Sequence, residues 1–156
     1  MRLALLLLVA SIATPLSAQL PEWVHPDTLS RTVTLDLVAA HGTLSGASAG
    51  KLQVVVPREW TVKLEWRNDD STAHSFIVQQ EREKLPERAG EPAFQYAYSR
   101  STATGMGVGR SDRTQFLVDQ AGWYWILCGV PGHAIAGEYI SLKVDAAATA
   151  VSVVSK

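Results

Sequence analysis

Four side chains of this 156-residue chain have the chemistry and the spacing of a metal site. Cys128 is the only cysteine, His133 follows it by five residues, and Glu138 follows His133 by five more. A fourth candidate, His74, begins the apolar run "HSFIVQ" after the turn-rich "NDDSTA". A thiolate and two imidazoles with a weak fourth ligand suit copper that cycles between Cu(I) and Cu(II). The sequence therefore predicts one copper ion bound by His74, Cys128, His133 and Glu138.

A lone cysteine is unusual in a chain that begins like an exported protein. Residues 1–18, "MRLALLLLVASIATPLSA", resemble a secretory signal peptide, with a basic Arg2, an apolar run and then small residues. The run is shorter than the ~20 residues that a membrane span needs. We therefore expect cleavage, a periplasmic or extracellular location and no membrane span afterwards. Exported proteins usually pair their cysteines, so Cys128 is a core side chain, half of an intermolecular disulfide, a nucleophile or a metal ligand.

Short strands are the elements that must position these donors. Seven runs alternate apolar and polar residues, namely 32–38, 51–56, 61–66, 74–79, 114–118, 123–128 and 139–144. Turn-forming residues separate several of them, and no strong helical pattern interrupts them. This rhythm favours an antiparallel β-sandwich or barrel. Because Cys128 ends one run and Glu138 precedes the next, a hairpin would bring both, with His133, to one end of the domain.

The remaining segments have less regular patterns. Residues 19–31 are expected to form a linker or packed arm, and residues 32–145 the single domain. Residues 146–156 are expected to form a loosely held C-terminal tail. Residues 80–113 make one long inserted loop, charged at its start and rich in Gly, Ser and Thr at its end. We expect this loop to cover the sandwich without supplying ligands.

The motif resembles the ligand loop of the cupredoxins, the blue copper proteins. The pattern is C-x4-H-x4-M, with a first histidine upstream at the start of a strand. The segments "GKLQVVVPREWTVKLEWRNDDSTAHSFIV" and "AGWYWILCGVPGHAIAG" look most like sulfocyanins in order and spacing, and the resemblance covers roughly residues 32–144. It implies an all-β, eight-stranded Greek-key sandwich, a mononuclear copper site and one-electron transfer outside the cytoplasm.

The resemblance also implies how the cysteine sulfur is surrounded. The backbone N–H groups of Ser75 and Val130 are expected to donate to the sulfur of Cys128, which spreads its charge and tunes the reduction potential. Asn68, ahead of the His74 loop, is expected to tie that loop to the ligand hairpin.

Glu138 is the departure from the family pattern, because it stands where sulfocyanins carry an axial methionine. A thioether is soft and neutral, whereas a carboxylate is hard and anionic and favours Cu(II) or zinc. Glu138 should therefore lower the reduction potential. A backbone oxygen, or Met106 in "TATGMGVGR", is the alternative fourth ligand.

The function predicted from these features is electron transport, not catalysis. Small apolar residues around His133 suit brief docking of a redox protein such as a cytochrome, an oxidase or a reductase. The formal net charge of −1 gives no support for nucleic-acid binding. Two alternatives stay open: a copper-binding or copper-tolerance protein with a Glu-ligated Cu(II) site and no redox traffic, and an enzyme with an open red-copper position.

Overall fold

The computed structural model describes residues 19–156, and these residues form ten β-strands and no helix. The strands are β1 (Val24–Asp27), β2 (Thr32–Ala40), β3 (Thr43–Leu44), β4 (Leu52–Pro57), β5 (Trp60–Asn68), β6 (Ile77–Gln80), β7 (Ser111–Val118), β8 (Gly122–Leu127), β9 (Tyr139–Asp145) and β10 (Ser152–Ser155). The predicted signal peptide, residues 1–18, lies outside the described residues. In the part of the chain that the structure describes, no helix is long and apolar enough to span a membrane.

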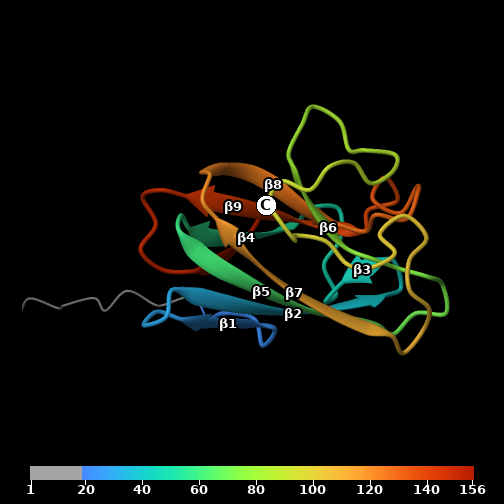
Figure 1. Ribbon diagram of the computed structural model, residues 1–156, viewed down its shortest axis with the longest axis horizontal. Helices are drawn as coiled ribbons and strands as arrows, with labels where there is room; N and C mark the ends of the chain where they lie inside the picture. The colour runs from blue at the N-terminus through green and yellow to red at the C-terminus, as the bar shows by residue number, and fades with distance from the viewer. Residues whose placement is uncertain (1–18) are drawn as a thin grey trace, which may run out of the picture.

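The strands form two sheets that lie one above the other as layers (Figure 1). One sheet has the order β1-β2-β5-β7, with β3 beside β2, and the other has the order β10-β4-β9-β8-β6. The predicted all-β sandwich is confirmed. Purely antiparallel pairing does not hold, because β2–β5 and β4–β9 are parallel. Between β2 and β5 the chain forms β4 in the other sheet, and between β4 and β9 it forms β5 and β7 in the other sheet. Such long connections permit parallel pairing.

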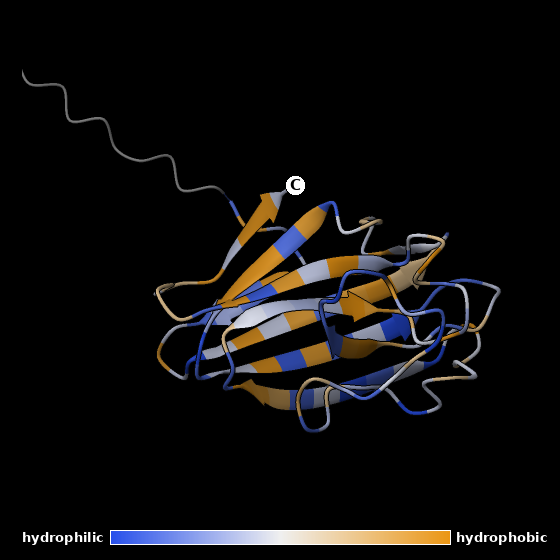
Figure 2. Ribbon diagram, turned by 90° about the horizontal axis from the view of Figure 1, so that it is seen from above, coloured by the Kyte–Doolittle hydropathy of each residue, from blue (hydrophilic) through white to orange (hydrophobic). Residues whose placement is uncertain are grey.

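Alternating side chains build the core between the two layers. In β5, Val62, Leu64 and Trp66 are buried while the residues between them face outward. Figure 2 shows the same alternation of hydrophobic and hydrophilic residues along several strands. Burying one large apolar side chain contributes about 1.5–3 kcal/mol. The ring of Trp66 packs 6.1 Å from that of Phe76, two residues after His74, so the core reaches the first ligand segment.

Both ends of the described chain are ordered. The arm contains β1, in which Val24 pairs with Leu35 and is buried. The expectation of a loosely held C-terminal tail is wrong, because β10 pairs antiparallel with β4 and the preceding Val151 joins the core cluster. The physical reason is that these valines cover core surface that would otherwise face water.

The long inserted loop connects β6 to β7 and extends beyond one end of the sandwich (Figure 1). The loop does not simply lie over the sandwich, because it also pairs with it. Its backbone forms isolated bridges that join Met106 to His74 and Tyr98 to Ile77. The loop therefore pairs directly with the segment that carries the first predicted ligand.

Candidate metal centre

The β8–β9 hairpin positions three of the four predicted ligands. Cys128 directly follows β8, Glu138 directly precedes β9, and His133 lies in the connection between them. The backbone N–H of Cys128 donates to the carbonyl of Glu138 at 3.1 Å, so the two residues face each other across the hairpin. The N–H of Glu138 donates to the carbonyl of His133 at 3.1 Å, which folds the connection back toward the strands. Local pairing thus brings three donors to one end.

One glycine allows the ligand loop to approach the inserted loop. A Cβ atom on Gly129 would lie 2.5 Å from Cγ2 and 2.8 Å from the carbonyl oxygen of Thr102. The N–H of Gly129 donates to Ser75 Oγ at 3.0 Å, and Ser75 Oγ–H donates to the Thr102 carbonyl at 2.7 Å. The segment after Cys128, the segment after His74 and the inserted loop are therefore held together beside the site.

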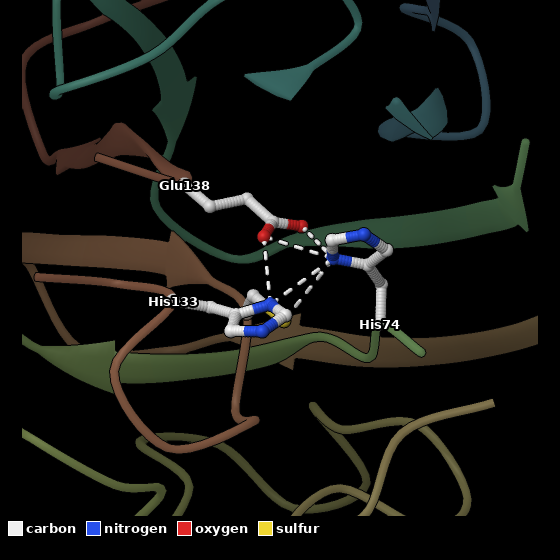
Figure 3. Close-up of side chains that lie close together, drawn as sticks. His74, His133 and Glu138 are labelled. Atoms are coloured by element: carbon white, nitrogen blue, oxygen red, sulfur yellow. Dashed lines mark hydrogen bonds and ion pairs between the residues drawn. The ribbon is translucent and has the colours of Figure 1, made fainter. Parts of the chain in front are cut away.

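His74 completes a compact cluster of four donor atoms, and Figure 3 shows how His74, His133 and Glu138 point toward one another. Its Nδ1 lies 2.7 Å from Glu138 Oε1 and 3.2 Å from His133 Nδ1. Glu138 Oε2 lies 3.1 Å from His133 Nδ1. The sulfur of Cys128 lies 3.5 Å from His133 Nδ1 and 3.8 Å from His74 Nδ1. One ligand atom from each of the four residues falls within 4.8 Å of all the others.

These separations fit a single small metal ion. Two nitrogens bound tetrahedrally at about 2.0 Å from one ion lie about 3.3 Å apart, and a thiolate sulfur lies about 3.5 Å from such a nitrogen. The His74–His133 and Cys128–His133 separations are 3.2 and 3.5 Å. Glu138 Oε1 is buried and makes no well-formed hydrogen bond within residues 19–156. An orphaned buried oxygen beside the His74 nitrogen, in a carboxylate whose other oxygen meets His133, is explained by a cation that binds all three side chains.

Burial controls the protonation of the metal-free site. It raises the pKa of the Glu138 carboxyl to about 8. Burial, together with the nearby Glu138, raises the pKa of the Cys128 thiol to about 11. Burial and His133 lower the pKa of His74. At neutral pH the carboxyl therefore keeps its proton and donates it toward the neutral His74 imidazole, while the thiol stays protonated.

The sulfur environment agrees with the sequence in part. The N–H of Ser75 points at the Cys128 sulfur at 3.5 Å, and the N–H groups of both Ser75 and Val130 lower the pKa of the thiol against the effect of burial. The expectation for Asn68 is wrong in its target. Its side-chain N–H groups donate to the carbonyls of Thr72 and Met106, each at 2.8 Å, and not to the ligand hairpin. Because Asn68 directly precedes the His74 loop, its amide reaches and satisfies a backbone carbonyl of that same loop.

Met106 makes its contact with His74 through the backbone. Its N–H donates to the His74 carbonyl at 2.7 Å and its carbonyl accepts from the His74 N–H at 3.2 Å. Its side chain packs against the core cluster of the sandwich. Glu138, by contrast, presents both carboxylate oxygens to the His74 imidazole. The geometry therefore favours Glu138 as the fourth donor.

Two residues that the sequence analysis missed contact the outer side of His74. Thr72 Oγ1 lies 2.8 Å and Asp70 Oδ2 lies 3.5 Å from His74 Nε2. Backbone N–H groups, first that of Thr72 and then that of His41, hold the pKa of Asp70 at about 2, so this carboxylate is ionised. The available signal was the run "NDDST", whose residue types favour side-chain bonds to nearby backbone.

Solved structures with the same fold include several copper proteins. An auracyanin from Roseiflexus castenholzii superposes with a TM-score of 0.52 at 18% identity, covering 72% of this chain and 96% of that one. Auracyanin A, a "blue" copper protein from Chloroflexus aurantiacus, gives 0.53 at 17% identity, with 73% and 99% covered. A copper nitrite reductase from Nitrosomonas europaea gives 0.54 at 21% identity, with 73% of this chain and 41% of that one covered. No curated protein sequence matches this chain.

A two-layer β-sandwich with one cysteine, two histidines and a fourth donor gathered at one end defines a cupredoxin, the class of the blue copper proteins. Within that class, residues 24–155 match the sulfocyanin (SoxE) domain. The chain belongs to the sulfocyanin family.

Proposed function

We propose that this protein carries single electrons between redox proteins outside the cytoplasm, with one copper ion bound by His74, Cys128, His133 and Glu138. The observation that carries the proposal is the convergence of these four donor atoms within 4.8 Å of one another at one end of the sandwich. Copper bound there would supply the Cu(II)/Cu(I) couple that accepts and releases one electron. Membership of the sulfocyanin family supports the choice of copper over zinc.

The surrounding chain limits how far the donors can move. Cys128 and Glu138 are joined by a backbone hydrogen bond across the hairpin, and Ser75 Oγ joins the His74 segment to the ligand loop through Gly129. One ligand atom from each of the four donors lies within 4.8 Å of all the others. A site that rearranges little between oxidation states has a small reorganisation energy and therefore transfers electrons fast. This supports a role in electron transfer.

His133 is the proposed exit for the electron. Its side chain is 28% exposed, whereas those of His74 and Glu138 are 3% and 2% exposed. Ile135, close by in the same loop, is 57% exposed and offers apolar contact surface. Weak electron-transfer encounters use small interfaces. We therefore place the docking of a cytochrome, an oxidase or a reductase at this end of the molecule.

Export is part of the same proposal. The sequence of residues 1–18 has the pattern of a secretory signal, and Cys128 is a free cysteine that is fully buried. Burial and metal binding would protect this thiol in an oxidising compartment, where unpaired cysteines are otherwise vulnerable.

Copper binding without redox traffic is the second candidate function, and the buried Glu138 carboxylate favours it. An anionic oxygen donor stabilises Cu(II) over Cu(I). An enzymatic role is less well supported, because four protein donors would leave no open position of the kind that catalytic metal sites keep.

The test is an optical spectrum, a reduction potential and an electron self-exchange rate for the Cu(II)-loaded protein. We expect an intense sulfur-to-copper charge-transfer band that disappears in Cys128→Ser, together with fast, reversible self-exchange. Colour that survives Cys128→Ser would refute the copper site. A site that binds Cu(II) but exchanges electrons slowly would replace electron transport with the copper-binding alternative.

A further inference from the structure

The imidazole of His74 is held on both of its nitrogens. Nδ1 faces the donor cluster, while Nε2 faces Thr72 Oγ1 at 2.8 Å and Asp70 Oδ2 at 3.5 Å. The side chain of His74 is only 3% exposed, so bulk water does not compete for Nε2. The outer contacts therefore decide which nitrogen carries the proton.

The chemistry of the cluster requires one tautomer. A metal ion bound in the cluster needs an unprotonated Nδ1 on His74, so the hydrogen must be on Nε2. Thr72 Oγ1 can accept that hydrogen, and the charge of Asp70 favours the positive end of the same N–H group. Such outer partners fix the tautomer and raise the basicity of a ligating imidazole.

We propose that Thr72 and Asp70 are positioning residues that lock His74 in its Nε2–H tautomer and strengthen it as a donor to Cu(II). The effect on copper rests on the proposed function, whereas the tautomer does not. Neither residue contacts another member of the donor cluster in the described hydrogen bonds and ion pairs. Their contact with the cluster is through His74.

The loop that carries these two residues is itself held in place. Asp70 accepts from the N–H of His41 at 2.7 Å and of Thr72 at 3.3 Å. The fully buried Asn68 accepts from the N–H of Asp70 at 2.8 Å and donates to the carbonyl of Thr72 at 2.8 Å. The carboxylate and the hydroxyl are thus presented to His74 by a closed set of bonds that reaches the β2–β3 turn.

The first test uses the metal-free protein and needs no copper. Long-range ¹H–¹⁵N correlation spectra at about pH 8, well above the ordinary histidine pKa of about 6.5, report which ring nitrogen carries the hydrogen. We expect the Nε2–H form in the wild type and in Thr72→Ser, which keeps the hydroxyl. Thr72→Val, which keeps the shape but removes the acceptor, should show a mixture of tautomers. An unchanged, pure Nε2–H form in Thr72→Val would overturn the role of Thr72 in setting the tautomer.

The second test measures copper affinity and reduction potential in the same variants. Loss of an outer-shell partner typically costs 10–100-fold in metal affinity. We expect Thr72→Val to bind Cu(II) about tenfold or more weakly and Cu(I) less affected, so that its potential rises, while Thr72→Ser stays near the wild type. Asp70→Asn, which retains size and removes charge, should also raise the potential.

The outcomes separate the two proposals. Wild-type affinity and potential in both Thr72→Val and Asp70→Asn would overturn the strengthening of His74 as a donor. If the wild type binds no copper, the proposed function fails, but the tautomer spectra still decide the positioning role. Should Thr72→Val fold poorly by circular dichroism, Thr72→Ala removes the same acceptor without adding a branched side chain and decides the tautomer in its place.

Discussion

Glu138 Oε2 and His74 Nδ1 meet at 2.9 Å, although the two residues are 64 positions apart in the chain and both are almost fully buried. In the metal-free protein at neutral pH this contact is a hydrogen bond from a protonated carboxyl to a neutral imidazole. A metal ion would take the place of the shared proton. The same two atoms can therefore serve either as a hydrogen-bonded pair or as two metal ligands.

Replacing Glu138 by methionine should raise the reduction potential and shift the spectrum toward that of a methionine-ligated blue copper site. The reason is that an ionised carboxylate attracts Cu(II) more strongly than Cu(I), and a thioether does not. Voltammetry and optical spectra of Glu138→Met and wild type across pH check this. If the potential and pH profile of the variant equal those of the wild type, Glu138 is not the fourth ligand.

Copper uptake should release about two protons per ion at pH 7, one from the Cys128 thiol and one from the Glu138 carboxyl. Both groups hold their protons in the metal-free protein because burial raises their pKa values, to about 11 and about 8. Titration in a weakly buffered indicator solution measures the release. Glu138→Gln, which has no carboxyl proton, is the matched control and should release about one; an equal release from both proteins would contradict the assignment.

The metal-free protein should lose stability as pH rises from about 6.5 to about 8. In this range the folded state keeps the Glu138 proton, at a pKa of about 8, whereas the unfolded state has already lost it at the ordinary value of 4.5. The folded state therefore binds more protons, and stability falls with rising pH. The loss is about 2 kcal/mol over this window.

The opposite contribution of His74, whose folded pKa is lowered, levels off as pH rises above its ordinary value of 6.5. Denaturant unfolding of the metal-free protein at a series of pH values measures the slope. Glu138→Gln should flatten it, whatever its effect on overall stability. A slope that persists unchanged in this variant would assign the pH dependence to another group.

Gly129→Ala should destabilise the protein by about 1–3 kcal/mol and disturb the copper spectrum. The added Cβ would lie 2.5 Å from Thr102 Cγ2 and 2.8 Å from the Thr102 carbonyl, so the inserted loop or the ligand loop must move. Movement there would break the bond from the Gly129 N–H to Ser75 Oγ. Gly107→Ala is the control, since no atom lies within 4 Å of its Cβ position. Equal stability and spectra for the two variants would show that the contact does not matter.

Shortening the inserted loop between Lys84 and Ala93 should leave the four ligands in place but remove hydrogen bonds that hold the ligand loop. The carbonyl of Glu87 accepts from the N–H of Gly132 at 2.8 Å, and the N–H of Ala89 donates to the Gly129 carbonyl at 3.4 Å. We expect a copper spectrum of wild-type type with lower thermal stability of the loaded protein. Complete loss of the charge-transfer band would show that this part of the loop is needed to build the site.

The hairpin donors were predictable from sequence because they are local. Cys128, His133 and Glu138 belong to one strand–loop–strand unit, and their residue types and spacing predict their convergence before any tertiary contact is known. The alternation in runs such as 61–66 likewise predicts strands with one buried face. The position of His74 at the start of an apolar run made it the fourth candidate, the family resemblance supported it, and the structure places its Nδ1 among the hairpin donors.

Only the tertiary structure decided how His74 meets the hairpin, which strands pair in parallel, and that β10 completes a sheet. These features depend on pairing between residues far apart in the chain. Periodicity and spacing report only local structure and do not reveal such pairing. The same holds for the raised pKa of Glu138 and for the contacts of Thr72 and Asp70 with His74 Nε2. Burial and neighbouring groups set the pKa of a carboxyl group. Both are present only in the folded protein, where the segments that carry these residues are packed together.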